Sequence, residues 1–147
     1  MSDKIRKAIP TDLPRIIALV EELSNKKINL SPEEKKKVFN EITAMPSSAL
    51  LVAEVNGYVA GTVYLQIVPS LVHNGRPWGI LEHMVVDKKY QRQGLGRKLI
   101  EAAVKICREA NCYKVGLSSS KFRKEAHEFY RTMGFEESAL SFRMYLD

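Results

Sequence analysis

The dipeptide Asn56-Gly57 lies between two runs rich in β-branched and aromatic residues, "ALLVAEV" and "VAGTVYLQIV". Asparagine and glycine readily adopt the positive φ angles that a two-residue hairpin turn requires. The sequence therefore predicts two antiparallel strands, about residues 49–56 and 58–67. This hairpin places the middle of the chain in a β-sheet, so the other predicted elements must pack against that sheet or extend it.

Helices and further strands are predicted on both sides of the hairpin. Upstream, Thr11 is the expected cap of a helix in "TDLPRIIALVEEL", and Ser31 with Glu34 forms a capping box at the start of "SPEEKKKVFNEI". Downstream, the short apolar run "ILEHMVV" predicts a buried central strand. A long helix after Gly94, a strand "YKVGLSS", a helix "RKEAHEFYRTM" and a final strand "ALSFRMYL" follow. We predict an α/β fold with a mixed sheet in a single domain, residues 1–147.

Composition narrows the class of protein. A chain of 147 residues with 45% hydrophobic and 27% charged residues is typical of one globular domain. No apolar run approaches the roughly 20 residues of a membrane span, and "MSDKIRKAIP" is unlike a secretory signal. We therefore expect a cytoplasmic protein with no membrane partner. Cys107, Cys112 and three scattered histidines fit neither a disulfide framework nor a metal-ligand spacing, so no metal is expected.

The net charge of +6 favours acidic ligands but does not say which kind. The basic residues are spread along the chain, and they do not alternate with aromatic residues as a base-stacking surface would require. We therefore expect no nucleic-acid partner.

Two glycines, Gly94 and Gly96, lie one residue apart in "QRQGLGRKLI", directly before the predicted long helix. Glycine lets the backbone bend tightly and approach a ligand, and the first amides of a helix have no partner within it. This pattern is typical of an anion site, most simply for a phosphate. A Walker A loop needs four residues between its glycines, and a dinucleotide fingerprint needs a small residue where the chain has Leu99. An ordinary glycine turn before a basic helix remains the alternative.

The spacing Gln91-x-x-Gly94-x-Gly96, between "MVV" and a long helix, resembles the acetyl-CoA signature Q/R-x-x-G-x-G/A of the GNAT superfamily of N-acetyltransferases. The stretch "EAHEFYRTMGFE" is similar to the second signature of that family. Its matching residues are Ala126, Phe129, Tyr130, Gly134 and Phe135. The resemblance implies acetyl-CoA as the acetyl donor. It also implies a mixed, mostly antiparallel sheet of about six to seven strands with a central splayed parallel pair, flanked by about four helices.

The resemblance implies where the donor would lie. The CoA pyrophosphate would rest on the glycine turn at the positive end of the helix dipole. The turn residues are Gln91, Arg92, Gln93, Gly94, Leu95, Gly96 and Arg97. The pantetheine arm would pair, like an extra strand, with the backbone of Met84, Val85 and Val86. Arg123 replaces an asparagine that is frequent in the family, and Ser119 or Ser120 is expected to take over its role, with solvated hydroxyls as the alternative.

Acetyl transfer to an amine needs a base, a polarised carbonyl group and a proton for the departing thiolate. The resemblance points to Tyr130 as the acid, since a tyrosine hydroxyl with a pKa near 10 stays protonated at neutral pH. A half-buried aromatic is the alternative. Glu82 is the expected base, because a carboxylate in an apolar strand either faces a site or costs stability. His83 is the other candidate, and strand alternation should send the two to opposite faces. The backbone N–H of Met84 would polarise the carbonyl group.

The acetyl acceptor is expected to be the primary amine of a small molecule. The stretch "SSSKFRKEAHEFY" is similar to a subgroup that includes aminoalkylphosphonate and aminoglycoside acetyltransferases. Arg76, Lys121 and Arg123 suggest an anionic group on the acceptor. A protein lysine or N-terminus is the alternative acceptor, and a non-catalytic acyl-CoA sensor is the alternative of another class. A homodimer is expected through pairing of "ALSFRMYL" between subunits, with a protected monomer as the alternative.

Overall fold

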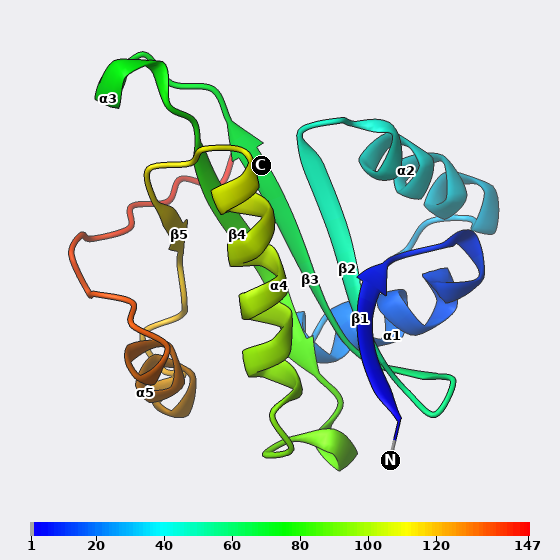
Figure 1. Ribbon diagram of the computed structural model, residues 1–147. Coiled ribbons are helices and arrows are strands. Elements are labelled where there is room, and N and C mark those ends of the chain that lie inside the picture. Colours follow the sequence, from blue (N-terminus) through cyan, green and yellow to red (C-terminus); the bar gives the residue numbers. More distant parts are fainter. Residues whose placement is uncertain (1) are drawn as a thin grey trace.

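A computed structural model of the protein describes residues 2–147, which form one five-stranded sheet with helices on both faces (Figure 1). The elements in chain order are β1 (Asp3–Lys7), η1 (Pro10–Asp12), α1 (Leu13–Ser24), α2 (Pro32–Ala44), β2 (Ser48–Val55), β3 (Tyr58–Val68), α3 (Val72–Gly75), β4 (Trp78–Val86), η2 (Lys88–Tyr90), α4 (Leu95–Glu109), β5 (Val115–Leu117) and α5 (Lys124–Thr132). None of the helices among these described residues has the length and apolar composition needed to cross a bilayer.

The sheet is mixed and mostly antiparallel, as the sequence predicts. The strands lie in the order β1-β2-β3-β4-β5, with antiparallel pairing up to β4 and a parallel β4–β5 pair. Asn56 and Gly57 connect β2 to β3 with φ angles of 49° and 82°, so the hairpin is confirmed. The strand count of about six to seven is too high. Strand β1 was not predicted from the sequence; it is a short strand of mostly charged residues that pairs with β2 at the edge of the sheet.

The starts of the first two helices differ in how well the sequence predicts them. Ser31 accepts a hydrogen bond from the Glu34 amide at 3.1 Å, and Glu34 accepts one from the Ser31 amide at 2.8 Å, which confirms the capping box. The prediction that Thr11 caps α1 is wrong, because η1 precedes that helix. Asp12 is the residue fixed here: it accepts from the Ile9 amide and from both guanidinium NH₂ groups of Arg6.

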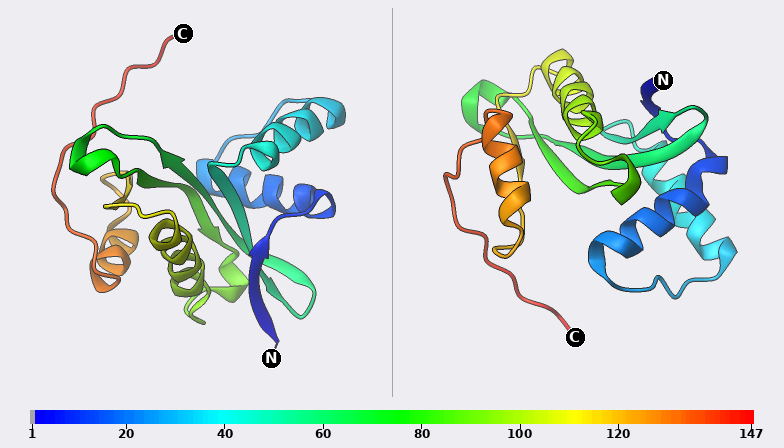
Figure 2. Two further views of the ribbon diagram at one scale, coloured as in Figure 1. Left: turned by 45° about the horizontal axis from the view of Figure 1, so that its top comes forward. Right: turned by 90° about the horizontal axis from the view of Figure 1, so that it is seen from below.

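Each face of the sheet has its own apolar core. On one face, α4 buries Leu95, Leu99, Ile100 and Ala103 against the sheet, and α5 packs beside it near β5 (Figures 1 and 2). On the other face, α1 and α2 bury a second cluster of Ile16, Leu19, Phe39, Val52, Val59 and Val85. The long apolar strands are therefore buried on both sides, which accounts for their nearly continuous hydrophobic runs.

Strand β4 contains a bulge that changes which side chains reach one side of the sheet. Tyr64 pairs with Glu82, and the next pair towards the end of β4 is Thr62 with Val85, so two β4 residues oppose one β3 residue. His83 occupies the bulge with a φ of 52°. A bulge interrupts the alternation of side chains, and Glu82 and His83 both line the cavity described below. The expectation that they face opposite sides of the sheet is therefore wrong.

The parallel pair of β4 and β5 is splayed, as the resemblance implies. The two strands pair from Gly79 to Leu81 on β4 and from Val115 to Leu117 on β5. The rest of β4, from Glu82 to Val86, has β3 on one side and no β5 partner among the described residues. Backbone groups along that edge are therefore available to an added strand or ligand.

The last predicted strand, "ALSFRMYL", does not form in this chain. Residues 135–147 contain no helix or strand, and the tail leaves the body of the molecule (Figure 2). Its alternating apolar side chains are 80–93% exposed, namely Leu140, Phe142, Met144 and Leu146. A strand requires a partner edge for its backbone groups, and the tail does not pair with one here. The predicted strand is therefore absent, because the alternating pattern alone does not provide a partner edge.

Candidate active site

A cavity of about 220 Å³ lies where β4 and β5 diverge. Its walls come from the end of α1, the bulge of β4, the segment after β5 and helix α5. The lining residues are Leu23, Leu81, Glu82, His83, Met84, Leu117, Ser118, Ser119, Ser120, Arg123 and Tyr130. The site therefore combines an apolar floor with hydroxyl, carboxylate, imidazole, guanidinium and phenol groups, as a small-molecule site requires.

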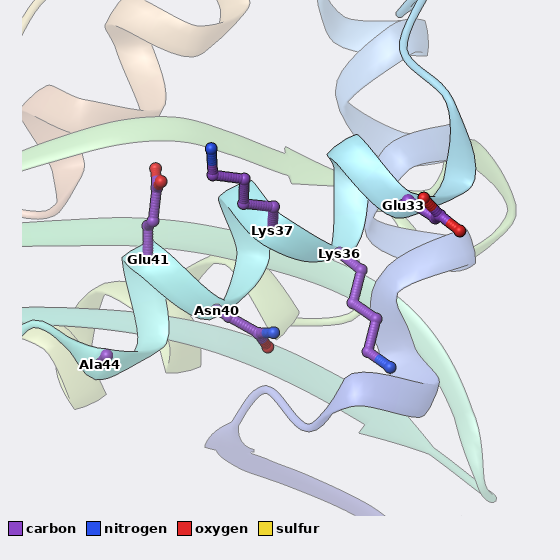
Figure 3. A pocket seen from close by; sticks show the side chains of 6 residues that line it. All are labelled: Glu33, Lys36, Lys37, Asn40, Glu41 and Ala44. Carbon is purple, nitrogen blue, oxygen red and sulfur yellow. The ribbon is translucent and has the colours of Figure 1, made fainter.

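A larger hollow of about 560 Å³ lies on the outer face of α2 (Figure 3). Its residues all come from this single helix, and they are Glu33, Lys36, Lys37, Asn40, Glu41 and Ala44. Figure 3 shows Lys37 and Glu41 pointing to one side of the helix and Lys36 and Asn40 to the other, so they do not converge on a common centre. Exposed side chains of both signs on a helix are typical of a solvated surface. We therefore place the candidate site at the cavity between β4 and β5.

Tyr130 lines this cavity from α5. Its side chain is 9% exposed, and its ring packs against the rings of Phe129 and Phe135 with centroid distances of 5.6 and 5.9 Å. Burial raises the pKa of Tyr130, while the nearby positive charge of Arg123 acts in the opposite direction. The hydroxyl therefore stays protonated beyond the usual range of tyrosine and can donate a hydrogen bond within the cavity.

Glu82, directly before the bulge of β4, and His83, within it, line the same cavity. The structure thus brings both candidate bases into the cavity with Tyr130, although strand alternation predicted that only one of the two would face it. The next residue, Met84, also lines the cavity and lies at the edge of β4 that has no β5 partner within the described chain. A carboxylate or imidazole here can accept a proton from a bound amine, and a backbone N–H can donate to an oxygen.

Ser119 lies in the cavity wall, and its Oγ is buried without a hydrogen-bond partner among residues 2–147. An unpaired buried hydroxyl is rare, and a ligand that hydrogen-bonds it would remove the penalty. The hydroxyl of the neighbouring Ser120 has a partner, since its Oγ accepts from the Phe122 amide at 3.5 Å. Of the two serines expected near the cofactor arm, Ser119 therefore has the hydroxyl that lacks a partner.

The glycine turn ends at α4, and its two glycines serve different purposes. Gly94 is the residue before the helix, with a φ of 84° that disfavours other residues. Gly96 lies inside the helix, where an added Cβ would be 3.3 Å from Cζ of Phe129 and 3.6 Å from Cε of Met84. The first glycine allows the turn, whereas the second allows α5 and β4 side chains to approach α4.

The turn presents backbone donors at the start of α4. Lys98 makes the first hydrogen bond of the helix, from its amide to the Gly94 carbonyl at 3.1 Å. The amides of residues 95–97 therefore have no partner within the helix. The side chain of Leu95 is buried in the core, so only its backbone is available to a ligand. Three adjacent amides at a helix start can bind an anion.

Two glutamine side chains of the turn bind the turn itself. Nε2 of Gln91 donates to the Val86 carbonyl at 3.0 Å, and Nε2 of Gln93 donates to the Lys89 carbonyl at 3.4 Å. Arg92 and Arg97 are exposed, and Arg92 has a φ of 62°. The glutamines therefore shape the backbone of the turn.

Not all of the three basic residues that suggested an anionic acceptor line the cavity. Arg123 lines it, whereas Lys121 does not. Arg76 donates from Nε to the Asn111 carbonyl at 3.1 Å and from an NH₂ group to the Cys112 carbonyl at 3.0 Å. Arg76 thus binds the carbonyls beyond the end of α4 rather than lining the cavity. No signal in the sequence distinguished these roles.

Comparison with known proteins agrees with the arrangement of these elements. The model of the acetyltransferase (GNAT) family matches residues 16–135. The chain belongs to the GNAT acetyltransferase family. It is thus an acetyltransferase by family, with the fold that the two signatures implied. A structure of an aminoglycoside N-acetyltransferase in complex with CoA shares the fold, with a TM-score of 0.83 and 19% identity. No group of three or more His, Cys, Asp or Glu side chains among residues 2–147 is placed to hold a metal ion.

Similar proteins include other GNAT acetyltransferases. A glucosamine 6-phosphate N-acetyltransferase of Trypanosoma brucei brucei is 37% identical over 88 residues, which are 60% of this chain and 58% of that protein, less than two thirds of its length. A crystal structure of glucosamine-6-phosphate N-acetyltransferase from Arabidopsis thaliana has a TM-score of 0.88 and 28% identity, and covers 100% of both chains. A putative acetyltransferase from Agrobacterium tumefaciens str. C58 has a TM-score of 0.91 and 32% identity, with 97% of this chain and 99% of that chain covered.

Proposed function

We propose that this GNAT acetyltransferase transfers an acetyl group from acetyl-CoA directly to the primary amine of a small cytoplasmic molecule. The observation that carries the proposal is the cavity between β4 and β5, where Tyr130 on α5 and the adjacent Glu82 and His83 on β4 line one space. An acid and a base that share one cavity are what direct transfer to an amine needs. Family membership supports acetyl-CoA as the donor.

The donor would extend from the glycine turn into the cavity. The free amides at the start of α4 would hold the pyrophosphate, and the backbone of Met84, Val85 and Val86 would pair with the pantetheine arm. Ser119 supports this path because its buried Oγ lacks a partner in the described chain and could bind an amide of that arm. Since a strand-like ligand uses main-chain hydrogen bonds, the apolar side chains of β4 remain in the core.

The chemistry would be divided between α5 and β4. Glu82 would accept the proton of the amine, directly or through water, so that the neutral amine can attack the thioester carbonyl carbon. The backbone N–H of Met84 would stabilise negative charge on the carbonyl oxygen. As the carbon–sulfur bond breaks, Tyr130 would donate its proton to the thiolate. His83 lines the same cavity and is the alternative base.

The acceptor would be a small amine that carries a phosphate or another anionic group. Arg123 supports this choice because it lines the cavity and can pair with phosphate oxygens in bidentate geometry. Relatives named as glucosamine 6-phosphate N-acetyltransferases support it further. A protein lysine or N-terminus is the alternative acceptor, and a cavity of about 220 Å³ is less suited to a peptide segment.

We expect measurable CoA release when purified protein is given acetyl-CoA and glucosamine 6-phosphate, with the N-acetylated product identified by mass spectrometry. The rate with unphosphorylated glucosamine should be at least tenfold lower, because one charge-assisted hydrogen-bonding partner is lost. Arg123→Gln should remove most of that preference. Faster acetylation of peptide N-termini would favour the alternative acceptor. CoA binding without release, across a broad panel of amines, would favour the sensor.

We also propose a homodimer in which the tail of one protomer pairs with the open edge of β5 in its partner. The exposed alternating side chains of residues 140–146 and the unpaired outer edge of β5 in the described chain support it. Leu140→Glu with Phe142→Glu should give a monomer in light scattering. Ser141→Glu, on the other side of the same segment, is the matched control and should leave a dimer. A monomeric wild type would refute the proposal.

A further inference from the structure

The segment that connects β4 to the glycine turn is fixed through one carboxylate, that of Asp87. Its Oδ1 accepts from the Lys89 amide at 2.9 Å, which caps the short helix η2. Its Oδ2 accepts from an NH₂ group of Arg15 at 3.0 Å and from the Tyr58 hydroxyl at 3.2 Å. The Asp87 amide donates to the Ala60 carbonyl at 2.7 Å. One residue therefore binds η2, helix α1 and strand β3 at once.

Arg15 and two tyrosines complete this cluster. Nε of Arg15 donates to the Val59 carbonyl at 3.2 Å, and its guanidinium lies 4.5 Å above the centre of the Tyr58 ring. The Tyr58 ring in turn stacks on Tyr90 of η2 with a centroid distance of 5.5 Å. The guanidinium and the two rings thus give η2 a second contact, in addition to its hydrogen bond to Asp87. A partly buried cluster in which one carboxylate accepts from three donors restricts geometry more than an exposed ion pair does.

Hydrogen bonds continue from this cluster to the glycine turn. The Lys89 residue that Asp87 caps provides the carbonyl that accepts from Gln93, directly before Gly94. Val86, directly before Asp87, provides the carbonyl that accepts from Gln91. The backbone between β4 and the free amides of α4 is therefore fixed at both its start and its middle, and Asp87 is the point where this segment is attached to other parts of the fold.

We propose that Asp87 is a positioning residue for donor binding: it holds the 88–94 backbone so that the free amides of α4 meet the CoA pyrophosphate. This inference rests on the proposed use of acetyl-CoA. The side chain of Asp87 is 14% exposed and is occupied by three protein donors, so its own negative charge is compensated within the protein. Preorganising a loop raises affinity because binding no longer has to order it. No contact between Asp87 and the ligand is needed.

The experiment measures the Kd for CoA by calorimetry. Asp87→Ala should raise it about tenfold, as expected when a preformed loop has to be ordered on binding. Asp87→Asn should restore part of the affinity, since an amide oxygen can still accept from the Lys89 amide. In the same variants kcat/KM for S-acetylpantetheine, a donor without the pyrophosphate and nucleotide, should stay within about twofold of wild type. A general loss of structure would lower both.

Asp12→Ala is the matched control. Asp12, like Asp87, accepts from a backbone amide and from an arginine, but these partners are Ile9 and Arg6 rather than residues beside the segment between β4 and the glycine turn. This variant should lower the melting temperature and leave the Kd for CoA unchanged. Tyr58→Phe removes one hydrogen bond to Asp87 and should raise that Kd two- to threefold, which also tests the proposal if Asp87→Ala does not fold.

An unchanged Kd in Asp87→Ala would overturn the proposal, as would an equal loss for CoA and S-acetylpantetheine. If Asp87→Ala does not fold, an unchanged Kd in Tyr58→Phe would overturn it. These results are distinct from failure of the proposed function. If wild-type protein did not bind CoA at all, the proposed donor would be wrong before any variant was compared.

Discussion

Tyr130→Phe should lower kcat for acetyl transfer by about 10²- to 10⁴-fold, the range expected for loss of a general acid. The substitution removes only the hydroxyl, and the remaining ring still packs between Phe129 and Phe135. The melting temperature and the Kd for CoA should therefore change little. Steady-state CoA release at saturating substrates measures kcat, and calorimetry with CoA measures the affinity.

The pH dependence provides a second test of Tyr130 as the acid. Burial raises the pKa of its hydroxyl, so the protonated form that donates to the thiolate persists at higher pH than for an ordinary tyrosine. The wild-type profile of kcat should show no loss from tyrosine deprotonation up to about pH 10. Tyr113→Phe is the matched control, because Tyr113 stacks on His73 and does not line the cavity. A Tyr130→Phe rate within twofold of wild type would exclude the acid role.

Local chemistry made part of this fold predictable. The Asn56-Gly57 turn and the Ser31 capping box depend on a few adjacent residues, and both occur as predicted. The Thr11 cap did not, because Asp12 is fixed by Arg6 of β1, and β1 was itself not predicted. The mostly charged sequence of β1 lacks the pattern of a strand, and β1 is stabilised by its pairing with β2. Edge pairing is a tertiary effect that propensity does not contain.

The same distinction applies to the candidate site. The signatures indicated Tyr130 and the glycine turn, and a carboxylate in an apolar strand indicated Glu82. The structure places Tyr130 and Glu82 in one cavity. The bulge at His83 was not predictable, because nothing in "ILEHMVV" shows that two residues will oppose one on β3. The hydrogen-bond partners of Arg76 were not predictable either, since they are backbone carbonyls about 35 residues away in sequence.

Because Glu82 and His83 both line the cavity, substitutions are needed to identify the base. If Glu82 is the base, Glu82→Gln should lower kcat about 100-fold. Glutamine preserves the size of the side chain and its hydrogen-bonding ability but cannot take a proton at neutral pH. Because the donor would be held by the turn and by the backbone of β4, the Kd for CoA should stay within twofold of wild type. Kinetics at saturating acetyl-CoA and acceptor, together with calorimetry, separate the two quantities.

His83→Asn is the comparison that decides between the two candidates, since both side chains line the cavity from adjacent positions. If Glu82 is the base, His83→Asn should change kcat by less than about threefold, well below the effect of losing a general base. The deficit of Glu82→Gln should also shrink as pH rises, because a growing fraction of the acceptor amine is then neutral without help from the enzyme. The opposite ranking of the two variants would assign the base to His83. Similar small losses in both would mean that the amine loses its proton to water rather than to a side chain of β4.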